Sequence, residues 1–118
     1  MSVLFLWYPR CSTCQKAKKW LDEHNIVYET RDIKEDRPNA AELKTWYEKS
    51  GLELKRFFNT SGMVYKSMNL KDKLPHLSEE DALALLAADG MLVKRPLLIA
   101  ENGVLAGFRE AAYQELLG

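Results

Sequence analysis

The sequence predicts an α/β domain: a mixed four-stranded sheet in which a βαβ unit and a ββα unit are separated by a helical insertion. Two observations support this class. Apolar runs short enough to be strands lie near both ends of the chain, and helix-spaced apolar residues fill the stretch between them. A chain of 118 residues can bury one core. We therefore expect a single domain over 1–118, with a sheet core at 1–35 and 91–118 and an insertion at about 36–90.

The first part of the chain has the pattern strand, helix, strand. An apolar run over 3–8 predicts the first strand. Cys14, Ala17 and Leu21 share one face of a helix that begins at about Ser12 and ends at about His24. A poorer alternating pattern over 27–33 predicts the second strand. Two strands joined through one helix form a parallel pair with a right-handed crossover.

Helix-start and helix-stop residues divide the insertion into short helices. Phe57 and Phe58, in a short helix over 53–58, are expected core anchors together with Trp20 and Trp46. The capping signals are Asn39 with Glu42 for a helix that ends at Gly51, Asn69 for a helix over 70–74, and Ser78 with Asp81 for a helix over 82–88 that ends at Gly90.

The last part of the chain returns to strands. Residues 96–100 and 104–107 are apolar and flank a Glu-Asn-Gly turn, which predicts a hairpin, and a final helix is expected over 110–117. The order βαβ, helical insert, ββα is that of a thioredoxin-like (glutaredoxin-like) fold interrupted by helices.

Composition excludes several classes of function. Seventeen basic and seventeen acidic residues cancel, so no overall positive charge points to direct nucleic-acid binding. No apolar run approaches the ~18 residues of a membrane span. The N-terminal run is short and has no basic residues before it, so it is typical of a strand rather than a signal peptide. We therefore expect a cytoplasmic protein, in which a Cys-x-x-C pair indicates redox or metal chemistry.

The only two cysteines, Cys11 and Cys14, lie between the first strand and the first helix. A helix N-terminus presents unpaired N–H groups and a partial positive charge, which favour a thiolate over a thiol. Arg10 adds a neighbouring positive charge. We predict that Cys11 is a nucleophile and that Cys14 is its resolving partner.

A zinc site and a pair of inert buried thiols are the alternatives to redox chemistry. A structural zinc site needs four ligands, and only His24 and His76 could join the two cysteines. His24 would lie about 15 Å from Cys14 along the helix axis, so no metal site is predicted. Both histidines are expected at the surface.

Lys94-Arg95-Pro96 comes directly before the third strand. A proline at a strand start can simply mark a position that needs no N–H donor, and an arginine there can be a solvated edge residue. In thioredoxin-like proteins, however, a cis proline at this place lies against the active-site cysteine. We therefore predict a cis Arg95-Pro96 bond and an Arg95 guanidinium that lowers the thiol pKa and binds an oxyanion. Arg109, at the start of the last helix, is a second candidate for anion binding or a surface residue.

Together, the segment 9–14, Lys94-Arg95-Pro96 and Gly107-Phe108-Arg109 resemble the ArsC/Spx family over essentially the whole chain. This family groups glutaredoxin-dependent arsenate reductases with the Spx transcription regulators, and residues 57–62 and 65–66 are most similar to an arsenate reductase-like, Spx/MgsR-like branch. The resemblance implies a thioredoxin-like sheet and a reactive Cys11. The oxyanion-binding arginines that it implies are Arg95 and Arg109, with Pro96 in a structural role. We also expect Arg10, Ser12 and Thr13, beside the cysteines, to take part in oxyanion binding.

Two departures from the arsenate reductase pattern affect the expected activity. The third arginine of such enzymes falls near Asn59 or Thr60, where this chain has no cation, and Arg56 is about one helical turn earlier. The second cysteine, Cys14, matches the Spx pattern, in which the pair forms a redox-switching disulfide. Spx regulators, however, carry further residues after the point where this chain ends.

The resemblance implies two functions of different classes. The first is a thiol-disulfide oxidoreductase without a bound cofactor, which glutathione, glutaredoxin or thioredoxin reduces and which can act on an oxyanion such as arsenate. The second is a redox switch that binds the RNA polymerase α subunit without turnover. An inactive scaffold of the same fold is a third reading. A monomer is expected in each case.

Overall fold

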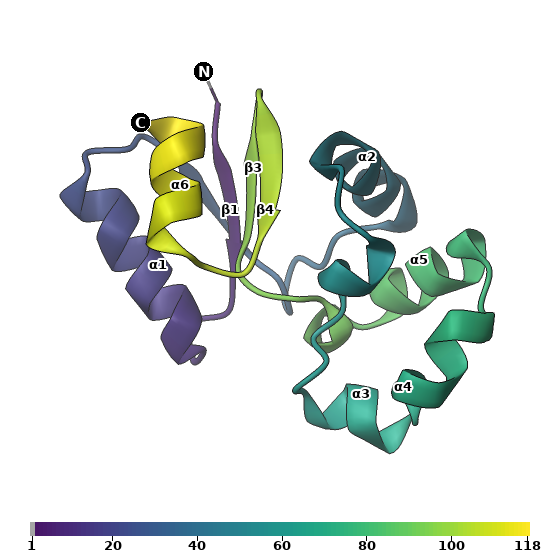
Figure 1. Ribbon diagram of the computed structural model, residues 1–118. Helices are drawn as coiled ribbons and strands as arrows, with labels where there is room; N and C mark the ends of the chain where they lie inside the picture. The colour runs from purple at the N-terminus through teal and green to yellow at the C-terminus, as the bar shows by residue number, and fades with distance from the viewer. Residues whose placement is uncertain (1) are drawn as a thin grey trace.

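A four-stranded mixed sheet runs through the centre of the molecule. In the computed structural model, which describes residues 2–118, the strands are β1 (Leu4–Trp7), β2 (Glu29–Asp32), β3 (Leu97–Ala100) and β4 (Gly103–Ala106), in the order β2-β1-β3-β4. β1 and β2 are parallel, and the other neighbours are antiparallel. The predicted fold class, a thioredoxin-like mixed sheet of βαβ and ββα units with helices between them, is confirmed (Figure 1).

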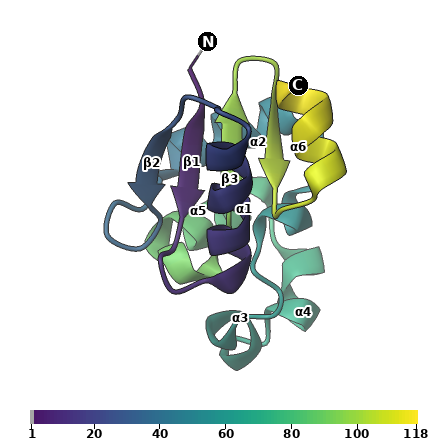
Figure 2. The same cartoon turned by 90° about the vertical axis from the view of Figure 1, so that its left-hand side faces the viewer.

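Helices α1 (Ser12–Glu23) and α6 (Glu110–Leu117) cover one face of this sheet (Figures 1 and 2). The predicted stripe of Cys14, Ala17 and Leu21 is buried. Trp20 of α1 packs edge-to-face on Tyr113 of α6, with ring centroids 5.7 Å apart. The side chains that complete this core include Val3, Phe5, Leu98 and Ala100.

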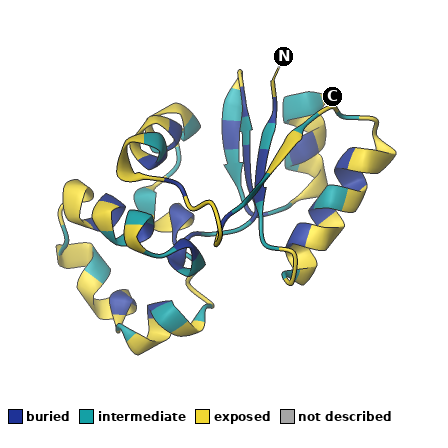
Figure 3. Cartoon of the chain, turned by 180° about the vertical axis from the view of Figure 1, so that it is seen from behind, coloured by how far each residue is buried: buried dark blue, intermediate teal, exposed yellow. Residues whose placement is uncertain are grey.

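The helices of the insertion lie on the opposite side of the sheet, and two of them extend past its end (Figures 1 and 2). They are α2 (Ala40–Ser50), η1 (Leu54–Phe57), α3 (Met63–Ser67), α4 (Leu70–Lys73), η2 (Leu74–His76), α5 (Glu79–Ala88) and η3 (Gly90–Leu92). Phe57, Phe58 and Trp46 are buried in one cluster with Leu6, as predicted for the first three. Because strand side chains alternate, Phe5 faces α1 while Leu6 faces the insertion. Figure 3 shows buried residues in helices on both sides of the sheet.

Most predicted helix ends are confirmed. The Asn39 side chain accepts from the Glu42 N–H at 2.8 Å, and the Glu42 carboxylate accepts from the Asn39 N–H at 3.1 Å, which completes the capping box. Gly51 ends α2 in the left-handed region, at φ 69°. Ser78 accepts from the Asp81 N–H at 3.1 Å.

Two helix ends differ from the prediction. Asn69 precedes α4, but it is itself left-handed and its side chain makes no capping bond. Helix α5 ends at Ala88 with Asp89 as the C-cap, so the prediction that Gly90 ends it is wrong. Gly90 instead begins η3, where a Cβ would overlap the Ile33 carbonyl. The glycine is required by close approach of two backbones rather than by helix termination.

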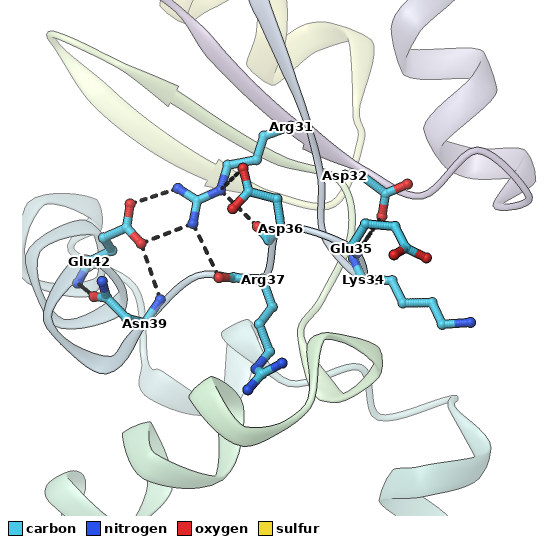
Figure 4. A network of polar contacts seen from close by, with 8 residues as sticks. All are labelled: Arg31, Asp32, Lys34, Glu35, Asp36, Arg37, Asn39 and Glu42. Atoms are coloured by element: carbon cyan, nitrogen blue, oxygen red, sulfur yellow. Dashed lines mark hydrogen bonds and ion pairs between the residues drawn. The ribbon is translucent and has the colours of Figure 1, made fainter.

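A polar network fixes the start of the insertion to strand β2 (Figure 4). Arg31 donates to both Glu42 carboxylate oxygens, at 2.6 and 3.0 Å, and also to the carbonyls of Asp36 and Arg37. The Asp32 carboxylate accepts from the N–H groups of the next turn. These bonds hold the segment between β2 and α2 in one conformation.

Over residues 2–118, no helix has the length and apolar character needed to cross a bilayer.

Candidate active site

Cys11 lies at the turn between β1 and α1 and is the N-cap of that helix. Its N–H donates to the Tyr8 carbonyl at 2.9 Å, which closes the turn. Its sulfur accepts from the Cys14 N–H at 3.3 Å, so the thiol satisfies one of the free donors at the helix start. Cys11 is half-buried, Cys14 is fully buried, and both are free thiols. The sequence therefore brings the two cysteines together through one helical turn.

The two thiols have opposite acidities. Partial burial raises the pKa of Cys11, but hydrogen bonds from Cys14 and the positive charge of Arg95 outweigh it, so its pKa lies below the ordinary value. Burial, followed by the hydrogen bond and negative charge of Cys11, raises the pKa of Cys14 to about 12. Of the two thiols, Cys11 therefore ionises first, and Cys14 stays protonated at neutral pH.

Arg95 supplies the positive charge beside this pair. The Arg95-Pro96 bond is cis, as predicted. The guanidinium lies over the Tyr8 ring, 5.3 Å from its centroid, and Nη1 is 3.4 Å from the Met91 carbonyl. Its Nε is buried and has no hydrogen-bond partner within residues 2–118. The side chain therefore has donor capacity that the described chain does not use.

The insertion holds the backbone that leads to Arg95. Phe58 and Val93 form an antiparallel bridge, with bonds of 2.7 Å from Asn59 N–H to the Leu92 carbonyl and from Lys94 N–H to the Phe57 carbonyl. Asn59 therefore lies beside the strand that enters the site. Asn59 and Thr60, near which the family pattern is expected to have its third arginine, follow this bridge directly, and neither carries a charge.

The other predicted anion-binding residues are more exposed. Arg10, Ser12 and Thr13 are all solvent-exposed around the start of α1. Arg109 is the N-cap of α6 and lines a pocket of about 200 Å³ together with Arg56. Gly107 also lines this pocket, and its N–H donates to the Pro96 carbonyl at 2.8 Å. An oxyanion-binding role for these residues stays a prediction.

Sequence reasoning missed two aromatic neighbours of the site. Tyr8 was expected only as the end of a strand, yet the Arg95 guanidinium packs over its ring. The Tyr113 hydroxyl is buried, and burial together with the charge of Cys14 raises its pKa. The position of Tyr8 directly before the cysteine loop is a weak signal that could have indicated its contact with Arg95. Nothing in the local sequence indicates that Tyr113 lies near Cys14.

The histidines lie away from the thiols. His24 stacks on Trp20 with ring centroids 3.8 Å apart, and its Nδ1–H donates to the Trp20 carbonyl, 2.8 Å away. His76 is in η2. Within residues 2–118, no three side chains of His, Cys, Asp or Glu are grouped as a metal site would require.

Comparisons with known proteins agree with this geometry. The model of the ArsC family matches residues 6–116. The chain is 56% identical to YusI from Bacillus subtilis (strain 168), over 98% of both chains. It is 30% identical to the global transcriptional regulator Spx from Enterococcus faecalis, over 92% of this chain and 81% of that protein. The crystal structure of a possible arsenate reductase from Streptococcus mutans UA159 is 50% identical, covers 97% of this chain and 96% of its own, and has a TM-score of 0.88.

Proposed function

This chain belongs to the ArsC family, and we propose that it is a cytoplasmic thiol-disulfide oxidoreductase in which Cys11 is the nucleophile and Cys14 the resolving thiol. The observation that carries the proposal is the asymmetry of the pair. Cys11 caps the helix, carries the lowered pKa and is partly accessible, whereas Cys14 is buried and has a pKa of about 12. One accessible thiolate and one protected thiol are what a two-step exchange requires.

The first step is attack by the Cys11 thiolate on one sulfur of a disulfide substrate. A bond forms between Cys11 and that sulfur, the substrate S–S bond breaks, and the other substrate sulfur leaves as a thiolate that takes a proton from solvent. Arg95 stabilises the thiolate of the resting protein. The product of this step is a mixed disulfide on Cys11.

The second step is attack by Cys14 on the Cys11 sulfur. After burial, the strongest influences that raise the Cys14 pKa are its hydrogen bond to Cys11 and the charge of Cys11. A mixed disulfide has no charge on Cys11, so its formation lowers the Cys14 pKa and favours the resolving thiolate. Cys14 loses its proton and attacks the Cys11 sulfur, so that the Cys11–Cys14 bond forms as the mixed disulfide breaks. The remaining substrate sulfur leaves as a thiolate and takes up a proton. Two electrons from glutathione, glutaredoxin or thioredoxin restore the dithiol.

An oxyanion such as arsenate is the second substrate class for the same thiol. Arg95 offers an unused buried Nε–H beside Cys11, which supports anion binding. The absence of a positive charge at Asn59 and Thr60 weighs against efficient binding, since one missing charge-assisted contact costs roughly 1.5–3 kcal/mol. We therefore expect the disulfide substrate to be processed better than arsenate.

A parallel assay tests this proposal. The reduced protein is supplied with glutathione and glutaredoxin and offered either arsenate or a small disulfide, with Cys11→Ser as the control. Turnover of the disulfide that is lost in Cys11→Ser supports the proposal. Equal turnover by wild type and Cys11→Ser would contradict it.

A second function is favoured by the 30% identity to the regulator Spx and by the second cysteine. In this alternative the Cys11–Cys14 disulfide changes a binding surface for the RNA polymerase α subunit and no substrate turns over. A pull-down of α subunit with reduced and oxidised protein separates the two. Redox-dependent capture, combined with no reductase turnover, would favour the regulator.

A further inference from the structure

Tyr8 contacts both members of the Cys11–Arg95 pair. Its carbonyl accepts from the Cys11 N–H at 2.9 Å and so closes the turn that holds the thiol. Its ring lies under the Arg95 guanidinium, with Cζ 5.3 Å from the ring centroid, which is within the ~6 Å over which an aromatic face attracts a cation. One residue therefore contacts the backbone of the nucleophile and the side chain of the cation.

The Arg95 side chain has few other contacts that could fix its position. Apart from Cys11 itself, its hydrogen-bond partner among residues 2–118 is the Met91 carbonyl, and at 3.4 Å from Nη1 this bond is long. No carboxylate of the described chain pairs with Arg95, and its buried Nε has no partner there. A long side chain loses rotamer freedom when it is held in one place. The contact with the Tyr8 ring is thus the main one that can offset this loss.

An aromatic face holds a cation differently from a carboxylate. A carboxylate beside Arg95 would accept its N–H donors and cancel its charge. The face of the Tyr8 ring attracts the cation through its quadrupole but carries no net charge. The guanidinium therefore keeps its positive charge while it is held.

The thiol uses that charge. Burial raises the pKa of Cys11, whereas hydrogen bonds from Cys14, followed by the charge and a hydrogen bond of Arg95, lower it. The attraction between two charges falls as their separation grows. A guanidinium that moved away from the ring into solvent would therefore stabilise the thiolate less.

The neighbouring aromatic residue, Trp7, has different contacts. Because strand side chains alternate, Trp7 packs against the core under α1, and Tyr8 packs against the core of the insertion. Lys18 lies over the Trp7 ring, 5.8 Å from its centroid. The chain thus offers two adjacent rings, each with a cation over it, and Arg95 lies over the ring of Tyr8.

We propose that Tyr8 is a positioning residue for the thiol chemistry, whose ring holds the Arg95 guanidinium beside Cys11 without neutralising it. The inference rests on the proposed exchange function and adds a residue to it. Tyr8 acts through Arg95, and its aromatic face rather than its hydroxyl carries the role.

Two substitutions at Tyr8 separate the aromatic face from the rest of the side chain. Tyr8→Phe keeps the ring, and Tyr8→Leu keeps an apolar side chain without it. We expect Tyr8→Leu to raise the pKa of Cys11 and to slow its alkylation by iodoacetamide at neutral pH about two- to tenfold. Tyr8→Phe should match wild type. Trp7→Leu is the matched control, because it removes the adjacent ring, over which Lys18 lies instead of Arg95.

A double variant shows whether Tyr8 acts through Arg95. In an Arg95→Gln background, Tyr8→Leu should leave the pKa of Cys11 unchanged, because the cation that the ring positions is absent. A further rise in that background would mean that Tyr8 acts through the cysteine turn, and it would overturn the proposal. Equal losses in Tyr8→Phe and Tyr8→Leu, an equal loss in Trp7→Leu, or no change in Tyr8→Leu would also overturn it.

The NMR signal of the Arg95 Nε–H tests the contact separately from the thiol chemistry. The signal is assigned by its absence in Arg95→Gln, and the ring current of Tyr8 should shift it in wild type and Tyr8→Phe but not in Tyr8→Leu. A ring-dependent shift with a Cys11 that iodoacetamide does not alkylate would sink the exchange function and leave the contact standing. A reactive Cys11 with no ring-dependent shift would overturn the role of Tyr8 and leave the exchange function standing.

Discussion

The two faces of the sheet differ in what they contribute to the site. The face under α1 and α6 carries a small core and holds Cys11 at the tip of α1. The face under the insertion carries a larger core, and its Phe58–Val93 bridge holds the backbone that leads to Arg95. The nucleophile is thus fixed from one side of the sheet and its cation from the other.

This difference indicates why the insertion matters for a thiol that it does not supply. α1 alone can provide the helix N-terminus, the Cys14 N–H and the resolving thiol. The position of Arg95 depends on η1 and η3, because hydrogen bonds to the Phe57 and Leu92 carbonyls hold the backbone segment that leads to it. Substitutions at the tip of α1 should therefore abolish the exchange reaction. Substitutions on the insertion side should instead change the unfolding free energy or the pKa of Cys11.

The largest effect is expected at the cysteines. Cys11→Ser should abolish attack on a disulfide, because serine cannot provide a thiolate nucleophile. Cys14→Ser should still attack once and then stop at a mixed disulfide. Mass spectrometry after incubation with a small disulfide measures the adduct. An adduct on Cys11→Ser at Cys14 would exchange the two roles and refute the assignment.

Core truncations compare the stability of the two faces. Phe57→Ala on the insertion side should cost about 3–5 kcal/mol of unfolding free energy, and Leu21→Ala on the α1 side about 2–5 kcal/mol, because both side chains are fully buried. Urea unfolding followed by tryptophan fluorescence and far-ultraviolet circular dichroism gives both values. We expect one shared transition in each variant. Separate transitions for the two probes would show that the faces unfold independently.

Removing the positive charge of Arg95 should change the pKa of Cys11 and leave the thiol itself in place. Arg95→Gln should raise the Cys11 pKa, because it removes a charge that lowers it. The alkylation rate at neutral pH should fall by roughly tenfold, as for one charge-assisted hydrogen bond. Arg10→Gln is the control, since Arg10 is exposed on the neighbouring loop. An equal fall in both variants would mean that overall charge, and not Arg95, governs the thiol.

The smallest effect is expected in the Arg31–Glu42 network. The hydrogen bond from Arg31 holds the pKa of Glu42 below its ordinary value of 4.5. A depressed carboxyl pKa stabilises the fold above the unfolded-state pKa and loses that contribution as pH falls through the folded-state pKa. Glu42→Gln should therefore cost ~1 kcal/mol at pH 7, discounted for its partial exposure, and less below pH ~4. Chemical denaturation at both pH values measures it, and a pH-independent difference would contradict the linkage.

Local patterns predicted the fold well because they act over a few residues. The capping box at Asn39 and the left-handed Gly51 depend only on their own helix. The prediction that Gly90 ends α5 was wrong. That glycine is required because the Ile33 carbonyl, far away in the sequence, leaves no room for a Cβ. Local signals carry no information on such contacts.

The site was predictable to a smaller extent. Cys11, Cys14 and the cis Arg95-Pro96 bond follow from short motifs and their resemblance to a family. The stacking of Arg95 on Tyr8 joins two segments that only the sheet brings together, through the pairing of β1 with β3. The shared pocket of Arg56 and Arg109 likewise joins the insertion to the last helix. Tertiary contacts of this kind have no signature in either segment alone.

The acidity of Cys11 is the most direct test of this account, because the nucleophile, the role of Arg95 and the two-step exchange all depend on it. The thiolate absorbance of the reduced protein, measured against pH with Cys11→Ser subtracted, reports this group alone. We expect a pKa below about 8.5, the unperturbed value, and no second thiolate until strongly alkaline pH. A Cys11 pKa at or above that value would contradict the account.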